Sequence, residues 1–366
     1  MQSISRIITI YSRPPPQPSV AHYQPMALQI HVQHVAQKQL FIKLKAKGEG
    51  IVMKKALMHI MVLAFCVMCC CVVAEAAPED NGPYTYTKYT QSITARDGGS
   101  ISTYVFVTSA AGPRPLIVFR HGFARSKDVM QNYGKHWGTR GFIVILNDSR
   151  TGISPDYTGK DSNDMIDCAN WAVQRSGQAG NYLSGKVNPT KVVFGGHSAG
   201  GYTAEIATYK NLALGEGNFD CGVMILYDPV PTDVGYAETI AQSIFIPSVM
   251  LYGVSDICNN FGAGTGIFQN TAGPSYGIYV KAADHCDFES YYTSACAIAC
   301  LKWPFGGWDP YKNSRVKRYG TAMIEAYLNC DPAAYPYING SAAQGDSGIQ
   351  IYPESRGLSM PPAGCP

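Results

Sequence analysis

Between residues 115 and 280 the chain carries short apolar runs separated by longer segments of mixed polarity. A run that is apolar at every position is typical of a strand buried on both faces of a sheet. The runs predict strands over residues 115–119, 142–146, 192–194, 223–227, 248–252 and 277–280. The segments around them predict helices over residues 126–137, 162–175, 199–212 and 315–328. Strands that alternate with helices predict a mostly parallel central sheet with helices on both faces.

Residues 84–95 and 101–109 have a different pattern, in which β-branched and aromatic residues alternate with polar ones. Alternation is typical of a strand with one exposed face. Asp97-Gly98-Gly99 separates the two segments, and Asp-Gly is a preferred hairpin turn. We therefore expect an antiparallel hairpin ahead of the parallel strands.

The first 76 residues have the pattern of a leader. Met53-Lys54-Lys55 is basic, residues 56–73 are mostly apolar, and Ala74-Glu75-Ala76 is a small-x-small cleavage signal. We predict a signal peptide at 53–76 and an unstructured upstream extension at 1–52. A membrane anchor is the alternative, for which the apolar run is somewhat short.

The remaining chain is expected to form one folded domain over 77–330. An irregular tail rich in Pro, Gly, Ala and Tyr is expected over 331–366. The leader holds eight of the 29 Lys and Arg and two of the 26 Asp and Glu. That leaves 21 basic and 24 acidic residues and a formal net charge of −3. Without a basic block, nucleic acid is not an expected partner. No stable membrane span is expected after cleavage.

Eight of the 12 cysteines lie beyond the leader, and an even number in an exported chain predicts disulfides. Zinc is the rival interpretation. The region after residue 76 has no C-x-x-C pair and only four histidines, so no metal is expected.

The candidate chemistry begins at Gly196-His197-Ser198-Ala199-Gly200, which reads G-x-S-x-G between a predicted strand and a predicted helix. A serine on such a sharp turn exposes its hydroxyl above the sheet, and small residues let the backbone pass close to itself. Ser198 is therefore the predicted nucleophile.

A serine hydroxyl needs a base, usually histidine. The region after the leader contains His121, His136, His197 and His285. This strand–turn–helix architecture orders its triad as serine, acid, histidine, and the side chain of His197 diverges from that of its neighbour Ser198. Only His285 fits, so we predict it to be the base.

Two aspartates after Ser198, Asp228 and Asp256, lie just after the carboxyl end of a predicted strand. Cys258 lies two residues after Asp256, and Cys286 follows His285. If Asp256 bonded to His285, these cysteines would lie close enough for a disulfide that fastens the acid loop to the base loop. We therefore predict Asp256 as the triad acid and a Cys258–Cys286 disulfide. Asp228 is the alternative acid.

The segment Arg120-His121-Gly122-Phe123 follows the predicted strand 115–119. In this architecture a backbone N–H of that loop pairs with the N–H of the residue after the nucleophile to form an oxyanion hole. We assign the two donors to Phe123 and Ala199.

At this point the chain resembles the α/β-hydrolase superfamily, and more closely its branch of bacterial cutinases, polyester (PET) hydrolases, dienelactone-hydrolase-like proteins and plant chlorophyllases. The resemblance rests on residues 115–123, 137–144, 196–201, 253–256 and 283–285. Asp228-Pro229-Val230 is similar to the D-P-V stretch of chlorophyllases, in which the aspartate is a proposed triad member. Part of the polyester-hydrolase subgroup joins its acid and base loops by a disulfide.

The resemblance implies the α/β-hydrolase fold and a serine ester hydrolase (EC 3.1.1) that needs no cofactor. We expect a secreted esterase that cleaves lipid, cutin-like or polyester substrates through an acyl-enzyme. Two alternatives are a chlorophyllase-type esterase that uses Asp228 as its acid and a non-catalytic binding protein on the same fold.

Overall fold

The computed structural model describes residues 76–151, 159–302 and 308–365. The predicted extension at 1–52 and all of the predicted signal peptide at 53–76 except Ala76 lie outside these residues. In the described part of the chain, no helix is both long enough and apolar enough to cross a bilayer.

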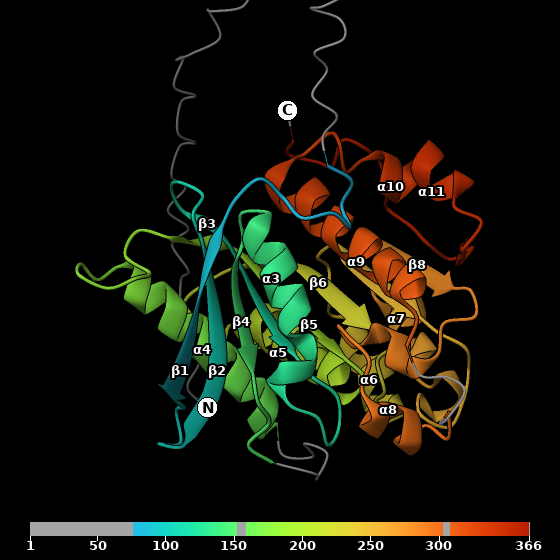
Figure 1. Cartoon of the computed structure of the whole chain (residues 1–366), viewed down its shortest axis with the longest axis horizontal. Coiled ribbons are helices and arrows are strands. Elements are labelled where there is room, and N and C mark those ends of the chain that lie inside the picture. Colours follow the sequence, from blue (N-terminus) through green and yellow to red (C-terminus); the bar gives the residue numbers. More distant parts are fainter. Residues whose placement is uncertain (1–75, 152–158, 303–307, 366) are drawn as a thin grey trace, which may run out of the picture. The chain divides into compact units, whose positions relative to one another are not determined.

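The described residues form one nine-stranded sheet with the order β1-β2-β4-β3-β5-β6-β7-β8-β9. Figure 1 shows the sheet with helices packed against it. From β4 to β8 neighbouring strands are parallel, whereas β2 is antiparallel to β4, and β9 is antiparallel to β8. This confirms the predicted mostly parallel sheet. The strands are β1 Tyr86–Thr94, β2 Ser100–Thr108, β3 Arg114–Arg120, β4 Ile143–Asn147, β5 Val187–His197, β6 Cys221–Tyr227, β7 Ser248–Tyr252, β8 Ser275–Val280 and β9 Ile349–Ile351.

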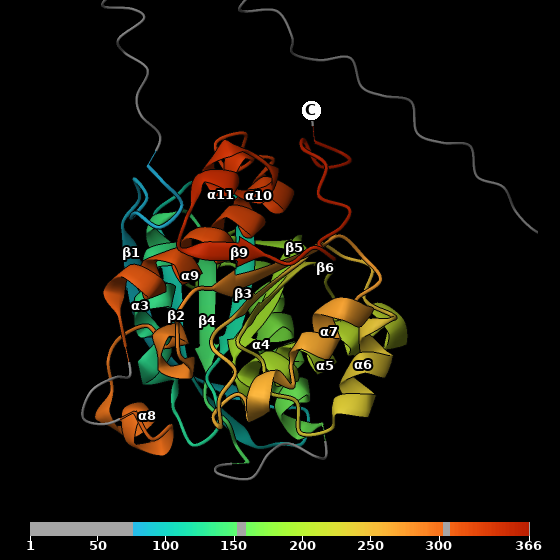
Figure 2. The same ribbon diagram turned by 90° about the vertical axis from the view of Figure 1, so that its right-hand side faces the viewer.

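The sheet separates two apolar cores, because neighbouring residues of a strand point to opposite faces. In β3, Leu116 belongs to one core and Ile117 to the other. Figure 2 shows α3 and α9 on one side of the sheet and α5, α6 and α7 on the other. With α4, these helices are α3 Gln131–Thr139, α4 Lys160–Ser176, α5 Ala199–Leu214, α6 Val234–Ala241, α7 Thr265–Asn270 and α9 Pro310–Ile324.

The expected hairpin is present as β1 and β2, which pair from Tyr86 opposite Thr108 to Thr94 opposite Ser100. The helix expected at 126–137 is instead a 3-10 turn, η1 (Lys127–Met130), followed by α3. Ser126 caps η1, and its hydroxyl accepts a hydrogen bond from the backbone N–H of Asp128.

The C-terminal segment, expected to be irregular, contains two short helices and one strand. The helices are α10 (Pro336–Asn339) and α11 (Ser341–Gly345), and β9 completes the sheet next to β8. Cys330 and Cys365 form a disulfide across this segment. The segment is therefore part of the folded unit.

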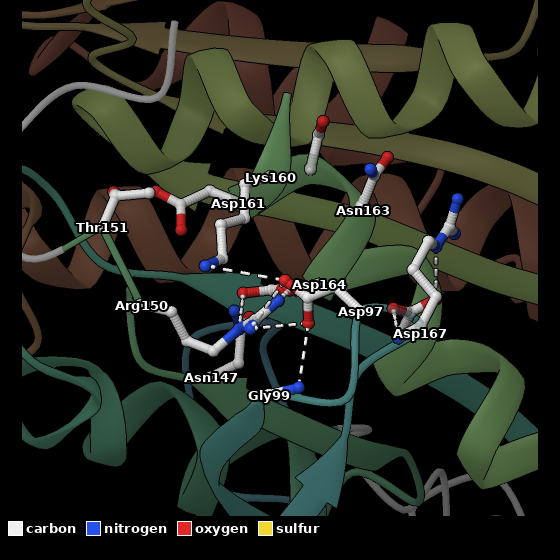
Figure 3. Close-up of polar contacts among 12 residues, drawn as sticks. Asp97, Gly99, Asn147, Arg150, Thr151, Lys160, Asp161, Asn163, Asp164 and Asp167 are labelled. Carbon is white, nitrogen blue, oxygen red and sulfur yellow. Dashed lines mark hydrogen bonds and ion pairs between the residues drawn. The ribbon is translucent and has the colours of Figure 1, made fainter. Parts of the chain in front are cut away.

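A polar network joins the hairpin turn to the segment after β4 and the start of α4 (Figure 3). Arg150 Nε donates to Asp164 Oδ2 at 2.7 Å, and Arg150 Nη1 donates to Asp97 Oδ1 at 2.9 Å. Lys160 Nζ lies 3.6 Å from Asp97 Oδ2. The Asp164 side chain is fully buried, whereas that of Asp97 is 45% exposed. One guanidinium thus bridges a buried and an exposed carboxylate.

Glu205 on α5 is a buried carboxyl group of a different kind. Within the described residues neither of its oxygens has a hydrogen-bond partner. Burial raises its pKa well above the usual value. The contribution of Glu205 to stability is therefore fully present below the unfolded-state pKa of about 4.3 and is lost as the pH rises toward the higher folded-state pKa.

We expect Glu205→Gln to match the wild type near pH 4 and to be more stable at pH 7. The difference should grow by about 1.4 kcal/mol per pH unit until the folded-state pKa is passed. Urea unfolding across this range measures it, with the exposed Glu354 changed to Gln as control. A difference that does not vary with pH would contradict a buried, neutral carboxyl group at position 205.

Candidate active site

Ser198 lies between β5 and α5, in the backbone conformation φ 58°, ψ −128°. A non-glycine residue rarely adopts a positive φ, and strain of this kind concentrates at functional sites. The turn is tight: a Cβ atom on Gly196 would lie 2.3 Å from the carbonyl oxygen of Gly200. The two glycines of the motif are thus required by a close backbone approach, as the sequence predicted.

His285 pairs with Asp228. Its Nδ1 lies 2.6 Å from Asp228 Oδ2, and both side chains are buried. His285 begins the 3-10 turn η3 (His285–Phe288), which a reciprocal capping box of Asp284 and Asp287 stabilises. Asp228 directly follows β6, and its N–H donates to the carbonyl oxygen of Leu251 in β7. Nδ1 therefore faces the acid, and Nε2 is the ring nitrogen left for a proton from a substrate or a nucleophile.

Ser198 and this pair come together through their neighbours. The N–H of Val230, two residues after Asp228, donates to the carbonyl oxygen of Ser198 at 3.1 Å. The rings of His197 and His285 have centroids 4.5 Å apart. The backbone of Ser198 is thus bonded to the segment that carries Asp228, and its neighbour His197 packs against His285.

Asp256, the acid preferred from the sequence, does not contact His285. Its Oδ1 accepts the N–H of Cys258 at 2.8 Å, and its Oδ2 lies 3.3 Å from Lys302 Nζ. Asp256 therefore caps its own turn and pairs with a lysine. The geometry favours the alternative acid, Asp228.

The expected Cys258–Cys286 disulfide is wrong. Cys258 is bonded to Cys300, and Cys286 is bonded to Cys296. Cys296 lies in α8 (Ser294–Ala299), a helix not expected from the sequence, and Cys300 caps its end. The four cysteines pack together, so α8 supplies the partners for both loops.

One group of three potential metal ligands converges within the described residues, and its members are Cys286, Cys296 and Cys300. Their sulfur atoms lie within 4.8 Å of one another. All three are in disulfides, and a cysteine ligand must be a thiolate. The group fits disulfide bonding rather than a metal site.

Asn259, which the sequence reasoning did not identify, holds the acid in place. Its Nδ2 lies 3.2 Å from Asp228 Oδ2 and 2.8 Å from the carbonyl oxygen of Val254. The N–H of Gly253 donates to Asp228 Oδ1 at 3.1 Å. Asp228 thus receives two donors besides His285. Nothing in the sequence marked Asn259 except its place in a turn between predicted strands.

The loop after β3, residues 121–125, lies beside Ser198. A Cβ atom on Gly122 would lie 3.3 Å from Ser198 Oγ, so a side chain there would crowd the Ser198 hydroxyl. Ala199 is the first residue of α5, where a helix leaves its N–H groups without intrahelical partners. Phe123 is 52% exposed. Arg125 anchors the loop by donating to both carboxylate oxygens of Glu289.

The three remaining histidines beyond the leader are buried, and burial is the main cause of their lowered pKa values. The pKa falls to about 4 for His121 and to about 3 for His136. For His197 it falls well below the usual value, helped by the neighbouring His285. His197 Nε2 lies 3.1 Å from the carbonyl oxygen of His285, and His136 Nε2 lies 3.1 Å from Thr321 Oγ1. These imidazoles are neutral at physiological pH.

A cavity of about 470 Å³ lies beside the acid, on β7, β8, β9 and the loop after β7. Its lining includes Asp228, Asn259 and the aromatic residues Tyr252, Phe261, Tyr279 and Tyr352. Ser198 and Phe123 are not in the lining. The cavity therefore borders the acid side of the site rather than the predicted oxyanion hole.

Comparison with known proteins gives two matches. The profile of the chlorophyllase family, an α/β-hydrolase-like family, matches residues 80–255, which include Ser198 and Asp228 but not His285. Dipeptidyl aminopeptidase BIII from Pseudoxanthomonas mexicana is 27% identical over 173 residues, which cover 42% of this chain and 23% of that protein. The chain thus spans about a quarter of the length of this curated relative. Neither match supports the expected resemblance to the cutinase or polyester-hydrolase branch. The sheet order and the strained serine between β5 and α5 are those of the α/β-hydrolase fold, and over residues 80–255 the chain is similar to the chlorophyllase family.

Proposed function

We propose that the protein is a serine hydrolase that cleaves carboxylic esters through an acyl-enzyme. Ser198 is the nucleophile, His285 the general base, and Asp228 the acid. The observation that carries the proposal is the buried His285–Asp228 hydrogen bond of 2.6 Å, which lies beside the strained turn that presents Ser198.

In the first half-reaction Ser198 Oγ attacks the ester carbonyl carbon while His285 Nε2 takes its proton. Asp228 accepts the hydrogen bond from Nδ1–H, which fixes the tautomer and stabilises the imidazolium. The carbonyl oxygen becomes an oxyanion that the N–H groups of Phe123 and Ala199 stabilise. The C–O bond then breaks, and the alcohol leaves with the proton from His285.

In the second half-reaction water attacks the acyl-enzyme. His285 takes a proton from the water and returns it to Ser198 Oγ as the acid leaves. The residues complete this cycle without a cofactor, because each proton passes through His285 between Ser198, the leaving alcohol and water.

Exposed apolar side chains beside the site support an apolar ester as the substrate. Ile257 and Leu301 are exposed. Ile257 precedes Cys258 and Leu301 follows Cys300, and these two cysteines are joined by a disulfide. Phe261 is exposed on the same loop, and its N–H donates to the carbonyl oxygen of Asp256. Grouped, exposed apolar side chains are typical of binding surfaces. Lipid, cutin-like, polyester and chlorophyll esters are the substrates to compare.

Peptide hydrolysis is the second candidate. It rests on the similarity to a protein named dipeptidyl aminopeptidase. The same serine chemistry cleaves amides, for which His285 would protonate an amine leaving group.

Labelling of Ser198 tests the proposal. We expect a p-nitrophenyl phosphonate to inactivate the protein, and peptide mapping to place the adduct on Ser198. Ser198→Ala should take no label. p-Nitrophenyl acetate should be hydrolysed faster than the matching p-nitroanilide. If no adduct forms and no ester is hydrolysed, a non-catalytic binding protein is the remaining interpretation. Faster cleavage of the anilide than of the ester would favour a peptidase.

We also propose that the protein is exported. Three disulfides support this, Cys258–Cys300, Cys286–Cys296 and Cys330–Cys365. Disulfides form and persist in oxidising compartments. The signal peptide at 53–76 remains a prediction from the sequence.

A further inference from the structure

His121 lies in the loop after β3 and is 3% exposed. Its two ring nitrogens have different partners. The backbone N–H of Ser149 donates to Nε2 at 3.1 Å, and Nδ1 lies 2.7 Å from the carbonyl oxygen of Gly122. Because a neutral imidazole nitrogen that accepts carries no hydrogen, the proton is on Nδ1. Nδ1–H therefore donates to Gly122.

The carbonyl that His121 holds belongs to the peptide bond between Gly122 and Phe123. In a trans peptide the C=O and the N–H point in opposite directions. Fixing the carbonyl oxygen of Gly122 therefore fixes the direction of the Phe123 N–H. Gly122 lies against Ser198, with an added Cβ only 3.3 Å from Oγ. The orientation of this peptide is thus set at the place where an oxyanion would form.

The second contact of His121 is itself anchored. Ser149 Oγ donates to Asp161 Oδ2 at 3.0 Å, and Asp161 pairs with the buried Arg120 at 2.6 Å. Asp161 belongs to the polar network at the start of α4 (Figure 3). Asp148 Oδ1 lies 3.7 Å from the same nitrogen, Nε2, and Lys127 pairs with Asp148. The ring is therefore held by the segment after β4, which is itself tied to Asp161 of α4.

We propose that His121 is a positioning residue, which holds the Gly122–Phe123 peptide so that the Phe123 N–H faces the oxyanion formed on Ser198. The inference rests on the proposed serine hydrolase function and extends it. It assigns a role to a buried histidine that the proton transfers do not use.

Two amide substitutions separate the two ring contacts. His121→Asn places an amide nitrogen where Nδ1 was, so it can still donate to Gly122. His121→Gln places an amide oxygen near the former Nε2, so it can still accept from Ser149 but loses the contact with Gly122. We expect His121→Asn to keep kcat for p-nitrophenyl acetate within about threefold and His121→Gln to lose about 10²-fold, the scale of an oxyanion donor. KM should stay within about twofold for both.

Phosphonate inactivation gives an independent readout, because the adduct places an oxygen in the oxyanion hole. Its rate constant should fall with kcat in His121→Gln and not in His121→Asn. The matched control is His136→Gln, a buried histidine that contacts Thr321 and no site residue. It should keep kcat even where its melting temperature falls.

Equal losses in the Asn and Gln variants, or losses that follow the unfolded fraction measured by circular dichroism, would overturn the positioning role. Wild-type kcat in both variants would overturn it as well. If the wild type itself neither reacts with phosphonate nor cleaves the ester, the proposed function fails first. The two failures are distinguishable, because only a failure of the proposed function leaves the wild type and every variant inert.

Discussion

Asp228→Asn is expected to lower kcat for ester hydrolysis by about four orders of magnitude, the loss seen when a triad aspartate becomes an amide. The expected cause is the tautomer of His285. An aspartate accepts the Nδ1–H of His285, whereas the NH₂ of asparagine can donate to Nδ1 and place the ring proton on Nε2. His285 then has no free lone pair toward Ser198.

Asp256→Asn is the matched control. Asp256 accepts the N–H of Cys258, and an asparagine oxygen can accept the same hydrogen bond. The substitution removes the ion pair between Asp256 and Lys302, whose side chain is 30% exposed. An ion pair that water reaches contributes little to stability. We expect kcat within about threefold of the wild type.

Ester hydrolysis by both variants, with folding checked by circular dichroism, decides between the two acids. A large loss in Asp256→Asn with an active Asp228→Asn would restore the acid preferred from the sequence. Comparable large losses in both would show that the Asp256 side chain acts on the site through Asn259, whose N–H donates to Asp256 Oδ1 and whose Nδ2 contacts Asp228.

The nucleophile and base could be proposed from the sequence because each depends on a local pattern or on elimination. Ser198 has a strand before it and a helix after it, and only one histidine lies far enough along the chain. The acid depends on tertiary structure. Asp228 and Asp256 follow the neighbouring strands β6 and β7, so both carboxylates reach the same edge of the sheet.

The disulfide argument failed because it assumed that the two cysteines nearest the site were partners. Cys296 and Cys300 lay in a stretch with no periodic pattern, and the short helix α8 brings both to the site. Sequence distance from Asp256 and His285 could not show this.

The parallel strands were predictable because they are buried on both faces and apolar throughout. The three residues of β9 were not, since Gln350 breaks the run and the strand exists by pairing with β8. The helices α10 and α11 are too short to carry a period. Tertiary contacts decide such elements.

Arg150→Met is expected to destabilise the fold by about 3–5 kcal/mol, because it leaves the fully buried Asp164 without its cation. Burial already raises the Asp164 pKa, against the opposing effect of Arg150. Without Arg150 the folded-state pKa rises further. The contribution of Asp164 to the stability of the variant is therefore retained below the unfolded-state pKa of about 3.9 and lost as the pH rises, so the variant is destabilised more at pH 8 than at pH 5.

Two further variants test whether the loss of stability in Arg150→Met comes from the buried, unpaired charge of Asp164. Asp97→Asn removes the exposed carboxylate on the same guanidinium and should change stability little, because water screens that pair. The double variant Arg150→Met/Asp164→Leu replaces the buried pair by apolar side chains and should recover most of the lost stability. Urea unfolding of all four proteins measures these differences. If the double variant is no more stable than Arg150→Met, the lost packing of the arginine side chain, rather than the orphaned carboxylate, accounts for the effect.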